Sequence, residues 1–489
     1  MITTEPRTGT VSAFGQLLIG ALLLGLAVWF WHLQGSPWPT MTRSRPAQWT
    51  ALLGIIAFTA ISAPALYSRR HKNVVSEHNP AGALWHVFHA SQTGFALELA
   101  ARTVSLLRGA GHAAALYPLN AFDGERFAES RCLFLVSTTG EGDPPDPALA
   151  FVQHPMRAPR ALQGIEYGIL ALGDRSYAHY CAFGHALDRW LAASGAMPMF
   201  DLVEVDNAAA PALQAWQAHI AAQTHTEQQD AFARAPLQAL ALSERVHVNP
   251  GSAGGAAFEL NLAPVQPGIE WQAGDIAEIR IGPADADADI YREYSIASLP
   301  VEGRLSLLVR MMRTPDGKPG LGSGWLCQQT TPGDDIQLRI RRNPNFHTPD
   351  GDVPLILIGN GTGIAGLRAH LRARFDAKRH RNWVLFGERN HAHDRFYDRD
   401  LATWLNEGAI AHLDRVYSRD ADSPHRYVQD ALAANADRLR QWMDDGAVIM
   451  VCGSREGMAP GVDQVLRDTL GDAAVDVLMA DGRYRRDVY

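Results

Sequence analysis

The N-terminal part of the chain carries two long apolar segments. Residues 11–33 have no formally charged side chain and end in an aromatic cluster at 29–31, and residues 49–67 are apolar between two aromatic ends. About 20 apolar residues suffice for a helix to cross a bilayer, and aromatic rings favour its interfaces. The pattern predicts a membrane hairpin of two transmembrane helices, with a cleaved signal peptide as the alternative for the first segment.

Basic residues around these segments predict their orientation. Arg7 and the basic cluster at 69–72 outnumber Arg43 and Arg45 between the segments, which places both ends in the cytoplasm. We therefore predict a location at the inner (cytoplasmic) membrane. His32 is the one histidine inside the two segments, and its place near the end of the first favours an interfacial residue over a transmembrane haem ligand.

After a polar tether at 69–83, the pattern changes to short apolar strands that alternate with helical stretches. This alternation predicts a parallel sheet flanked by helices, and it returns from Val353 onward. Between the two α/β units, strands shorten and turn signals such as TPDGKPG (314–320) multiply, as in an antiparallel barrel. A polar stretch at 221–236 separates the first unit from the barrel.

Composition narrows the class of protein. The chain has 489 residues, of which 47% are hydrophobic, so several domains can each bury a core. Its formal charge is −8 with no basic stripe, which argues against a nucleic-acid partner. The four cysteines form no CxxC pair, so no metal or iron–sulfur site is predicted, and reduced thiols fit best.

Three loops of the first unit follow predicted strands, namely SQTGFA (91–96), STTGEGDPP (137–145) and LGDRSYAHYCAF (172–183). At the start of a helix, backbone N–H groups and the hydroxyls of Ser91 and Thr93 can hold a phosphate. Such loops converge at the carboxyl edge of a parallel sheet, where the ring of Tyr177 would meet a flat ligand. Core packing is the alternative role for Tyr177.

The later units add two more ligand loops. In YREYSIAS (291–298), Arg292 offers a forked cation for a pyrophosphate and Tyr294 lies on the same strand face, with the glycine-rich turn 320–326 nearby. The turn GNGTG (359–363) has the glycine spacing that lets a dinucleotide approach the backbone. Arg419 and Arg426 could pair with a ribose 2′-phosphate, which favours NADPH over NADH, with a solvated charge cluster as the alternative.

In this order the motifs resemble those of the diflavin reductases, most closely the flavoprotein subunit of NADPH-sulfite reductase. The matched stretches are SQTG, STTGEGDPP, LGDRSY, REYSIAS, GTGIA, SRD with YVQD, VCG and the terminal RYRRDVY. The resemblance implies a flavodoxin-like α/β domain followed by a ferredoxin-NADP reductase-like module, an antiparallel β-barrel FAD domain plus an α/β NADP domain. The expected boundaries are 1–83 for the hairpin and tether, 84–222 for the FMN domain, 223–236 for a linker, 237–346 for the FAD barrel and 347–489 for the NADPH domain.

The resemblance also implies site residues. For FMN they are Ser91, Gln92, Thr93, Gly94, Phe95, Ala96, Ser137, Thr138, Thr139, Gly140, Gly142, Leu172, Gly173, Asp174, Tyr177, Tyr180, Cys181, Phe183 and Asp206. For FAD they are Arg292, Glu293, Tyr294, Ser295, Leu308, Val309, Arg310, Gly320, Leu321, Gly322, Ser323 and Tyr489. For NADPH they are Gly359, Gly361, Thr362, Gly363, Ser418, Arg419, His425, Arg426, Tyr427, Gln429 and Cys452.

Ser295, Cys452 and Asp487 match catalytic residues near the FAD and the nicotinamide, and Tyr489 would cover the FAD ring. The chain departs from the family in one large feature, because only sixteen residues separate Asp275 from Arg292, where the family has a helical insert between its flavin domains. The relative placement of the two flavin domains therefore stays open.

These observations predict a membrane-anchored NADPH-dependent flavoprotein oxidoreductase whose flavin domains face the cytoplasm. Electrons would pass from NADPH to FAD, to FMN and then to an acceptor: a sulfite reductase haemoprotein-like partner, another haem protein or a ferric chelate. The alternative is a flavin-binding redox sensor or assembly subunit without turnover. The sequence leaves the acceptor, the flavin potentials and the oligomeric state undecided.

Overall fold

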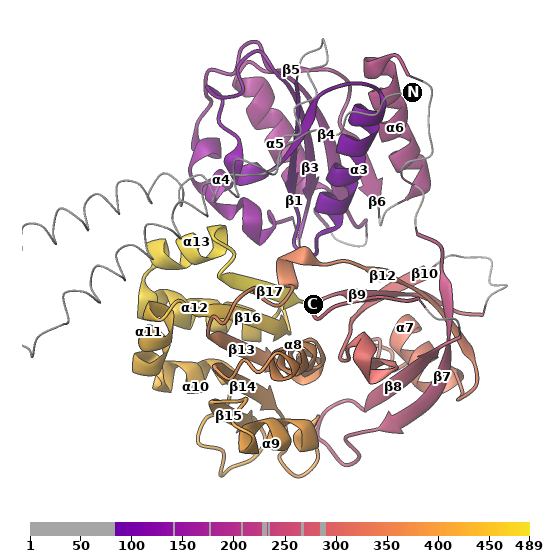
Figure 1. The fold of residues 1–489 in the computed structure, drawn as a ribbon, viewed down its shortest axis with the longest axis vertical. Helices are drawn as coiled ribbons and strands as arrows, with labels where there is room; N and C mark the ends of the chain where they lie inside the picture. Colours follow the sequence, from indigo (N-terminus) through magenta and orange to yellow (C-terminus); the bar gives the residue numbers. More distant parts are fainter. Residues whose placement is uncertain are drawn as a thin grey trace, which may run out of the picture. The chain divides into compact units, whose positions relative to one another are not determined.

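The computed structural model describes residues 84–489 except 140–141, 176–177, 207–208, 227–231, 233–234, 266–267 and 284–289. All of the described residues belong to one compact unit of the chain. They form three sheets with their helices, which follow one another along the sequence (Figure 1). The predicted membrane hairpin lies outside the described residues.

The first α/β domain is a parallel sheet with helices on both faces. Its strands are β1 (Trp85–Ala90), β2 (Ala114–Pro118), β3 (Arg131–Ser137), β4 (Glu166–Gly173), β5 (Met197–Pro198) and β6 (Val203–Asp206), in the order β2-β1-β3-β4-β5 with β6 paired to β4. Its helices are α3 (Phe95–Gly109), α4 (Leu149–Gln153), α5 (Ala182–Ala193) and α6 (Ala210–Thr224), with short 3₁₀ turns at Leu119–Ala121, Asp146–Ala148 and Pro155–Arg157.

The central strands β1, β3 and β4 are buried on both faces, which explains their almost continuous apolar character. One face packs against α3 and α6, where Leu99 and Trp216 join the core. The other face packs against α4 and α5, where Phe151 and Leu187 join a second core. The carboxyl edge of the sheet is left for loops.

The middle domain is a six-stranded antiparallel sheet in the order β10-β9-β12-β7-β8-β11. Its elements are β7 (Gln238–His247), β8 (Ala257–Pro264), β9 (Ile276–Ile281), β10 (Ile290–Ser295), β11 (Leu305–Arg310), α7 (Leu321–Gly324), a π-helical turn (Trp325–Gln329) and β12 (Asp335–Arg341). Short 3₁₀ turns lie at Pro300–Glu302 and Pro344–Phe346. The alternation of inward apolar residues encloses one core that includes Leu260 and Ile279.

The second α/β domain is a five-stranded parallel sheet in the order β15-β14-β13-β16-β17. Its strands are β13 (Leu355–Asn360), β14 (Asn382–Glu388), β15 (His412–Tyr417), β16 (Val448–Gly453) and β17 (Tyr484–Val488). Its helices are α8 (Ile364–Asp376), α9 (Asp398–Asn406), α10 (Val428–Ala434), α11 (Ala436–Asp444), α12 (Met458–Leu470) and α13 (Asp472–Ala480), with a 3₁₀ turn at Gly361–Gly363.

The C-terminal motif of the sequence forms the edge strand β17. It pairs in parallel with β16, so that Cys452 lies opposite Asp487 and Gly453 lies opposite Val488. The strand brings the end of the chain back to the carboxyl edge of this sheet (Figure 1).

Candidate functional site

The loops after β1, β3 and β4 meet at one edge of the first sheet, because these strands are parallel neighbours. Ser91 follows β1 and is 2% exposed, and among the described residues its hydroxyl has no hydrogen-bond partner. A buried hydroxyl without a partner is costly, and a phosphate oxygen would satisfy it. Gly94, in the left-handed conformation (φ 78°), then starts α3, whose first turn offers free N–H groups. The residues present therefore fit the phosphate of FMN.

The second and third loops are closed by their own hydrogen bonds. The backbone N–H of Thr139 donates to the carbonyl of Asp143 (2.8 Å), and that of Phe183 donates to the Thr138 hydroxyl (3.3 Å). Asp206, at the end of β6, accepts a hydrogen bond from the backbone of Arg175 (3.1 Å) and so holds the β4 loop. The predicted residues of these loops lie together at this edge, while Gly140 and Tyr177 lie outside the described residues.

The side chain of Gln92 binds residues outside its own loop. Its side-chain amide donates to Asp146 (2.8 Å) and to the carbonyl of Arg486 (3.1 Å), and its oxygen accepts from the Asp146 backbone (3.0 Å). This amide is therefore engaged with the neighbouring chain segments. Only the backbone of Gln92 remains for a phosphate.

In the antiparallel domain, β10 and α7 carry the residues predicted to bind a pyrophosphate, and they pack on each other. A Cβ on Gly322 would lie 2.7 Å from Cγ of Arg292 and 3.1 Å from the hydroxyl of Tyr294, so the glycine lets α7 pack on both side chains. The hydroxyl of Ser323 accepts a hydrogen bond from the Met312 backbone (3.0 Å). Burial raises the pKa of Tyr294, which keeps this phenol neutral.

Two charged residues of the predicted FAD set are held by ion pairs. Glu293 accepts from Arg341 (2.6 Å). Arg310, at the end of β11, pairs with Glu388 at the end of β14, and this pair links the antiparallel domain to the second α/β domain. Burial raises the pKa of Glu388 despite the nearby Arg310. The sequence pattern did not single out Glu388.

Four residues from three distant segments form what we call the junction cluster: Ser295, Cys452, Asp487 and Tyr489. The Ser295 hydroxyl donates to Oδ2 of Asp487 (2.8 Å), and the Cys452 thiol lies 3.8 Å from the same oxygen. The Tyr489 hydroxyl lies 3.3 Å from that of Thr362. The sequence resemblance predicted this set, and the pairing of β16 with β17 brings it together.

Burial sets the electrostatics of the junction cluster. It raises the pKa of Asp487, which the hydrogen bond from Ser295 only partly offsets. Burial also raises the pKa of the Cys452 thiol, and the nearby Asp487 carboxylate raises this pKa further. The sulfur therefore stays protonated. Tyr489, the last residue, is 58% exposed. The cluster thus offers a buried acid and a thiol beneath a terminal ring.

The turn after β13 approaches the chain closely. A Cβ on Gly363 would lie 2.1 Å from the carbonyl oxygen of Cys452, and one on Gly359 would lie 2.7 Å from it. Asn360 accepts a hydrogen bond from the Ser454 backbone (2.9 Å). The glycines therefore let β13 and α8 pack on the end of β16, beside the junction cluster, as a dinucleotide turn requires.

The loop between β15 and α10 holds the remaining predicted NADPH residues. Arg419 and Arg426 are exposed, and Nε of Arg426 donates to the carbonyl of Ser418 (3.4 Å). Gln429 packs on Gly461, and its side-chain oxygen is buried without a partner among the described residues. The two exposed guanidinium groups suit an anionic group of a ligand, whereas the unsatisfied oxygen of Gln429 accepts and therefore suits a ligand N–H or hydroxyl.

Besides Glu388, three contributors to the site were missed at the sequence level: Asp146, Asn345 and Arg486. Asp146 pairs with Arg486 and Asn345 binds Ser91, each across more than 250 positions of the chain. No local pattern signals such contacts.

Comparisons with known proteins agree with this geometry. Residues 87–219 match the flavodoxin family, and residues 357–464 match the oxidoreductase NAD-binding domain. The chain is 28% identical to the sulfite reductase NADPH flavoprotein alpha-component of Yersinia enterocolitica, over 84% of this chain and 90% of that protein. It is 27% identical to the proteins of the same name from Neisseria meningitidis and Cronobacter sakazakii, each over 82% of this chain and 89% of the relative.

The two domain matches and these relatives support a diflavin reductase close to the sulfite reductase flavoprotein subunit. The alignment with the Yersinia protein runs over 545 positions, more than this chain's 489 residues, so that relative carries residues that this chain lacks. This agrees with the short connection between Asp275 and Arg292.

The predicted location at the inner membrane is wrong on these findings. Within the part of the chain that the structure describes, no helix combines the length and the apolar character needed to cross a bilayer, and the relatives are named as components of sulfite reductase. The prediction rested on the length of two apolar runs, which a transmembrane helix requires but which does not by itself establish one. Both runs, residues 11–33 and 49–67, lie outside the described residues.

Proposed function

We propose that the chain is an NADPH-dependent diflavin reductase that carries electrons from NADPH through FAD and FMN to an acceptor. When bound, these three cofactors supply the hydride and single-electron chemistry. The observation that carries the proposal is the junction cluster, in which residues from the antiparallel domain and the second α/β domain share one buried carboxylate. Two dinucleotide cradles, around Gly322 and Gly363, open beside it.

The chain's own residues have distinct tasks in this scheme. Asp487 holds Ser295 by a hydrogen bond of 2.8 Å and so fixes the end of β10 relative to β16. Because burial disfavours its ionised form, Asp487 is suited to hold a proton next to a reacting ring. Tyr489 would cover the FAD ring; its backbone is held by hydrogen bonds with Gly453 and Arg455, so only the side chain of this 58% exposed residue has to move aside.

The first α/β domain takes FMN in this proposal. Its support is the unsatisfied hydroxyl of Ser91 at the start of α3 and the convergence of three loops at one sheet edge. We propose the domain boundaries expected from the sequence: 84–222 for this domain, 223–236 for the linker, 237–346 for the FAD domain and 347–489 for the NADPH domain. Arg419 and Arg426 support NADPH, because two exposed guanidinium groups suit a 2′-phosphate.

For the acceptor we propose a haemoprotein of the kind that a sulfite reductase flavoprotein serves. The support is that the relatives are components of sulfite reductase, and that acidic residues outnumber basic ones in the first domain, which suits a basic partner surface. A ferric chelate is the second candidate acceptor.

Anaerobic addition of NADPH to protein reconstituted with both flavins tests the proposal. We expect the absorbance of FAD and of FMN to fall in turn, and reduced protein to reduce a purified sulfite reductase haemoprotein. Bleaching of neither flavin would leave the sensor or assembly role. Bleaching of both with reduction only of ferric chelates would move the acceptor to the second candidate. A Cys452→Ala variant that bleaches at the unchanged rate would contradict the role of the junction cluster.

A further inference from the structure

The strand β17 presents adjacent residues to two different sites. Asp487 points to Ser295 and Cys452 in the junction cluster. Arg486, one residue earlier, instead forms a two-pronged ion pair with Asp146 of the first α/β domain, from Nε to one carboxylate oxygen and from Nη2 to the other. Successive side chains of a strand point to opposite faces. One short strand therefore touches both the hydride site and the flavodoxin-like domain.

The ion pair is part of a larger contact. The Arg486 and Asp146 side chains are only 19% and 16% exposed. Gln92 binds Asp146 through both ends of its amide and also donates to the Arg486 carbonyl. All the polar atoms of the Gln92 side chain are thus used at this contact. Because Gln92 belongs to the β1–α3 loop (residues 91–94), the proposed phosphate loop itself is attached to β17.

A second segment holds the same loop from the other side. Asn345 donates to the carbonyl of Ser91 (2.7 Å), and a Cβ on Gly94 would lie 3.0 Å from Cδ of Pro344. The β1–α3 loop thus lies between β17 and the turn that follows β12. If the first domain changes its position relative to the other domains, the β1–α3 loop must move relative to β17 and to the turn after β12.

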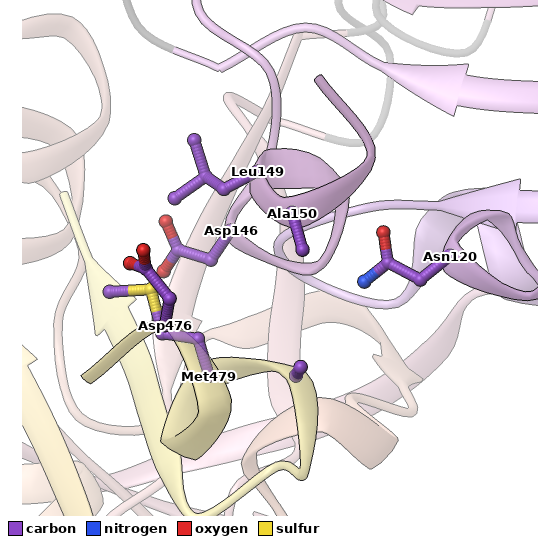
Figure 2. Close-up of a pocket in the computed structure, with 7 residues that line it drawn as sticks. Asn120, Asp146, Leu149, Ala150, Asp476 and Met479 are labelled. Atoms are coloured by element: carbon purple, nitrogen blue, oxygen red, sulfur yellow. The ribbon is translucent and has the colours of Figure 1, made fainter. Parts of the chain in front are cut away.

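Beside the ion pair, the described side chains of the two domains face each other and leave no space for a water molecule between them. Figure 2 shows residues of this contact, among them Asn120, Asp146 and Leu149 on one side and Asp476 and Met479 on the other. Asp476 on α13 contributes a second acid and pairs with Arg467 (3.0 Å). Interfaces of this polar kind between domains allow relative motion. The charge of Arg486 is then a main attraction that holds Asp146, and with it the loop, in place.

We propose that Arg486 is a positioning residue for electron transfer between the two flavin domains, because it seats the β1–α3 loop on the strand that carries the junction cluster. The inference rests on the proposed function. In this proposal Asp487 serves the hydride transfer to FAD, and Arg486 positions the first domain for the electron transfer from FAD to FMN. The two residues lie on opposite faces of β17.

The primary variant is Asp146→Asn, which removes the charge that Arg486 binds and leaves β17 unchanged. A swap, Asp146→Arg with Arg486→Asp, tests whether the attraction itself matters. The matched control is Asp437→Asn, which breaks the exposed pair of Asp437 with Arg440 on α11, away from both sites. All are studied as the full chain with both flavins.

Two readouts separate positioning from mere stability. In anaerobic stopped-flow mixing with NADPH, we expect Asp146→Asn to slow the FMN phase about tenfold, the effect of a free-energy change of roughly 1.4 kcal/mol, and to leave the FAD phase within about twofold. In hydrogen exchange, we expect faster exchange of amides 91–94, with amides of the α3 core unchanged. The swap should recover part of both effects, and the control should show neither.

An FMN phase in Asp146→Asn equal to that of the unsubstituted protein would overturn the inference, as would an equal loss in both phases. Exchange at 91–94 that does not differ from the control would overturn it as well. Failure of the proposed function has a different signature: the unsubstituted protein then bleaches neither flavin, while the exchange measurement still reports whether the ion pair seats the loop.

Discussion

Gly363 offers the sharpest test of how closely the dinucleotide turn must approach the junction cluster. Its backbone has ordinary helical angles (φ −58°, ψ −23°), so Gly363→Ala introduces no backbone strain. The new Cβ, however, would lie 2.1 Å from the carbonyl oxygen of Cys452, 2.4 Å from its carbon and 2.7 Å from Cα of Gly453. All three atoms are backbone, so no side chain can rotate away.

The size of the effect follows from these distances. A carbon and a carbonyl oxygen in contact normally lie about 3.3 Å or more apart, so the start of α8 and the end of β16 must separate by about 1.2 Å. Displacements of about 1 Å at reacting groups cost roughly a hundredfold in rate. Overpacking costs about 1–3 kcal/mol of stability. We therefore expect a folded protein in which NADPH reduces FAD about a hundredfold more slowly.

Stopped-flow bleaching of FAD by saturating NADPH, with bound flavin quantified first, measures this rate. The control is Gly109→Ala at the end of α3, where nothing lies within 4 Å of the added carbon, and its rate should not change. The reasoning is refuted if Gly363→Ala binds FAD fully and bleaches within about threefold of the unsubstituted rate, because the close approach would then have no bearing on hydride transfer.

Three further predictions concern charges that join the domains. Arg368→Met should lower the free energy of unfolding by roughly 3 kcal/mol, because it leaves Glu302 only 9% exposed and without its partner. Burial alone would raise the pKa of Glu302, but Arg368 outweighs burial and lowers this pKa. The stability that the Arg368–Glu302 pair contributes is therefore present above pH 4.5 and is lost as the pH falls through the lowered pKa of the folded state. The denaturation midpoint, measured as a function of acid pH, tests this second prediction. Burial raises the pKa of Asp487, so its ionised form destabilises the fold as pH rises through the raised pKa; Asp487→Asn should increase stability most at about pH 8 while it slows FAD reduction.

Matched variants check each of these three. Arg372 lies one turn from Arg368 on α8 and pairs with Asp376 in an exposed position, so Arg372→Met should cost no more than about 0.5 kcal/mol. Equal losses in Arg368→Met and Arg372→Met would contradict the first prediction. An acid slope that survives in Arg368→Met would contradict the second. The third fails if Asp487→Asn has the same effect on the denaturation midpoint at about pH 5 and about pH 8.

The positions of the ligand loops could be predicted from the sequence because strand pattern alone constrains them. Parallel strands have their carboxyl ends at one edge, so loops at 91–96, 137–145 and 172–183 had to converge. The same reasoning placed the turn 359–363 at the edge of the second parallel sheet. In each case a local sequence pattern of strand, glycine and helix is enough to predict where the loop lies.

The strand β17 was not predicted, for an identifiable reason. Its buried residues are Tyr484 and Asp487, which are three positions apart, so the period of two that marks a half-buried strand is absent. Arg485 and Arg486 are only half-buried because each finds a partner far away in sequence, the carbonyl of His347 and the carboxylate of Asp146. Such partners leave no trace in the local hydropathy pattern.

Gln92 shows which part of a residue a motif determines. Its place in SQTG predicts a contact with FMN, for which its backbone is still available, while its side-chain amide binds Asp146 and the carbonyl of Arg486. A motif fixes the backbone of a loop, because the helix start and the glycine conformation depend on adjacent residues. It does not fix where a long, flexible side chain goes once another domain offers it hydrogen-bond partners.

The short connection between Asp275 and Arg292 raised the question of how the first domain is held without the family's helical insert. The described contacts give a physical answer: the β1–α3 loop binds directly to β17 and to Asn345. These contacts act on the loop itself and on the strand that carries Asp487. A chain without the insert should therefore depend more on the charge of Arg486 than its longer relatives do, and the salt concentration that slows its FMN phase should be correspondingly lower.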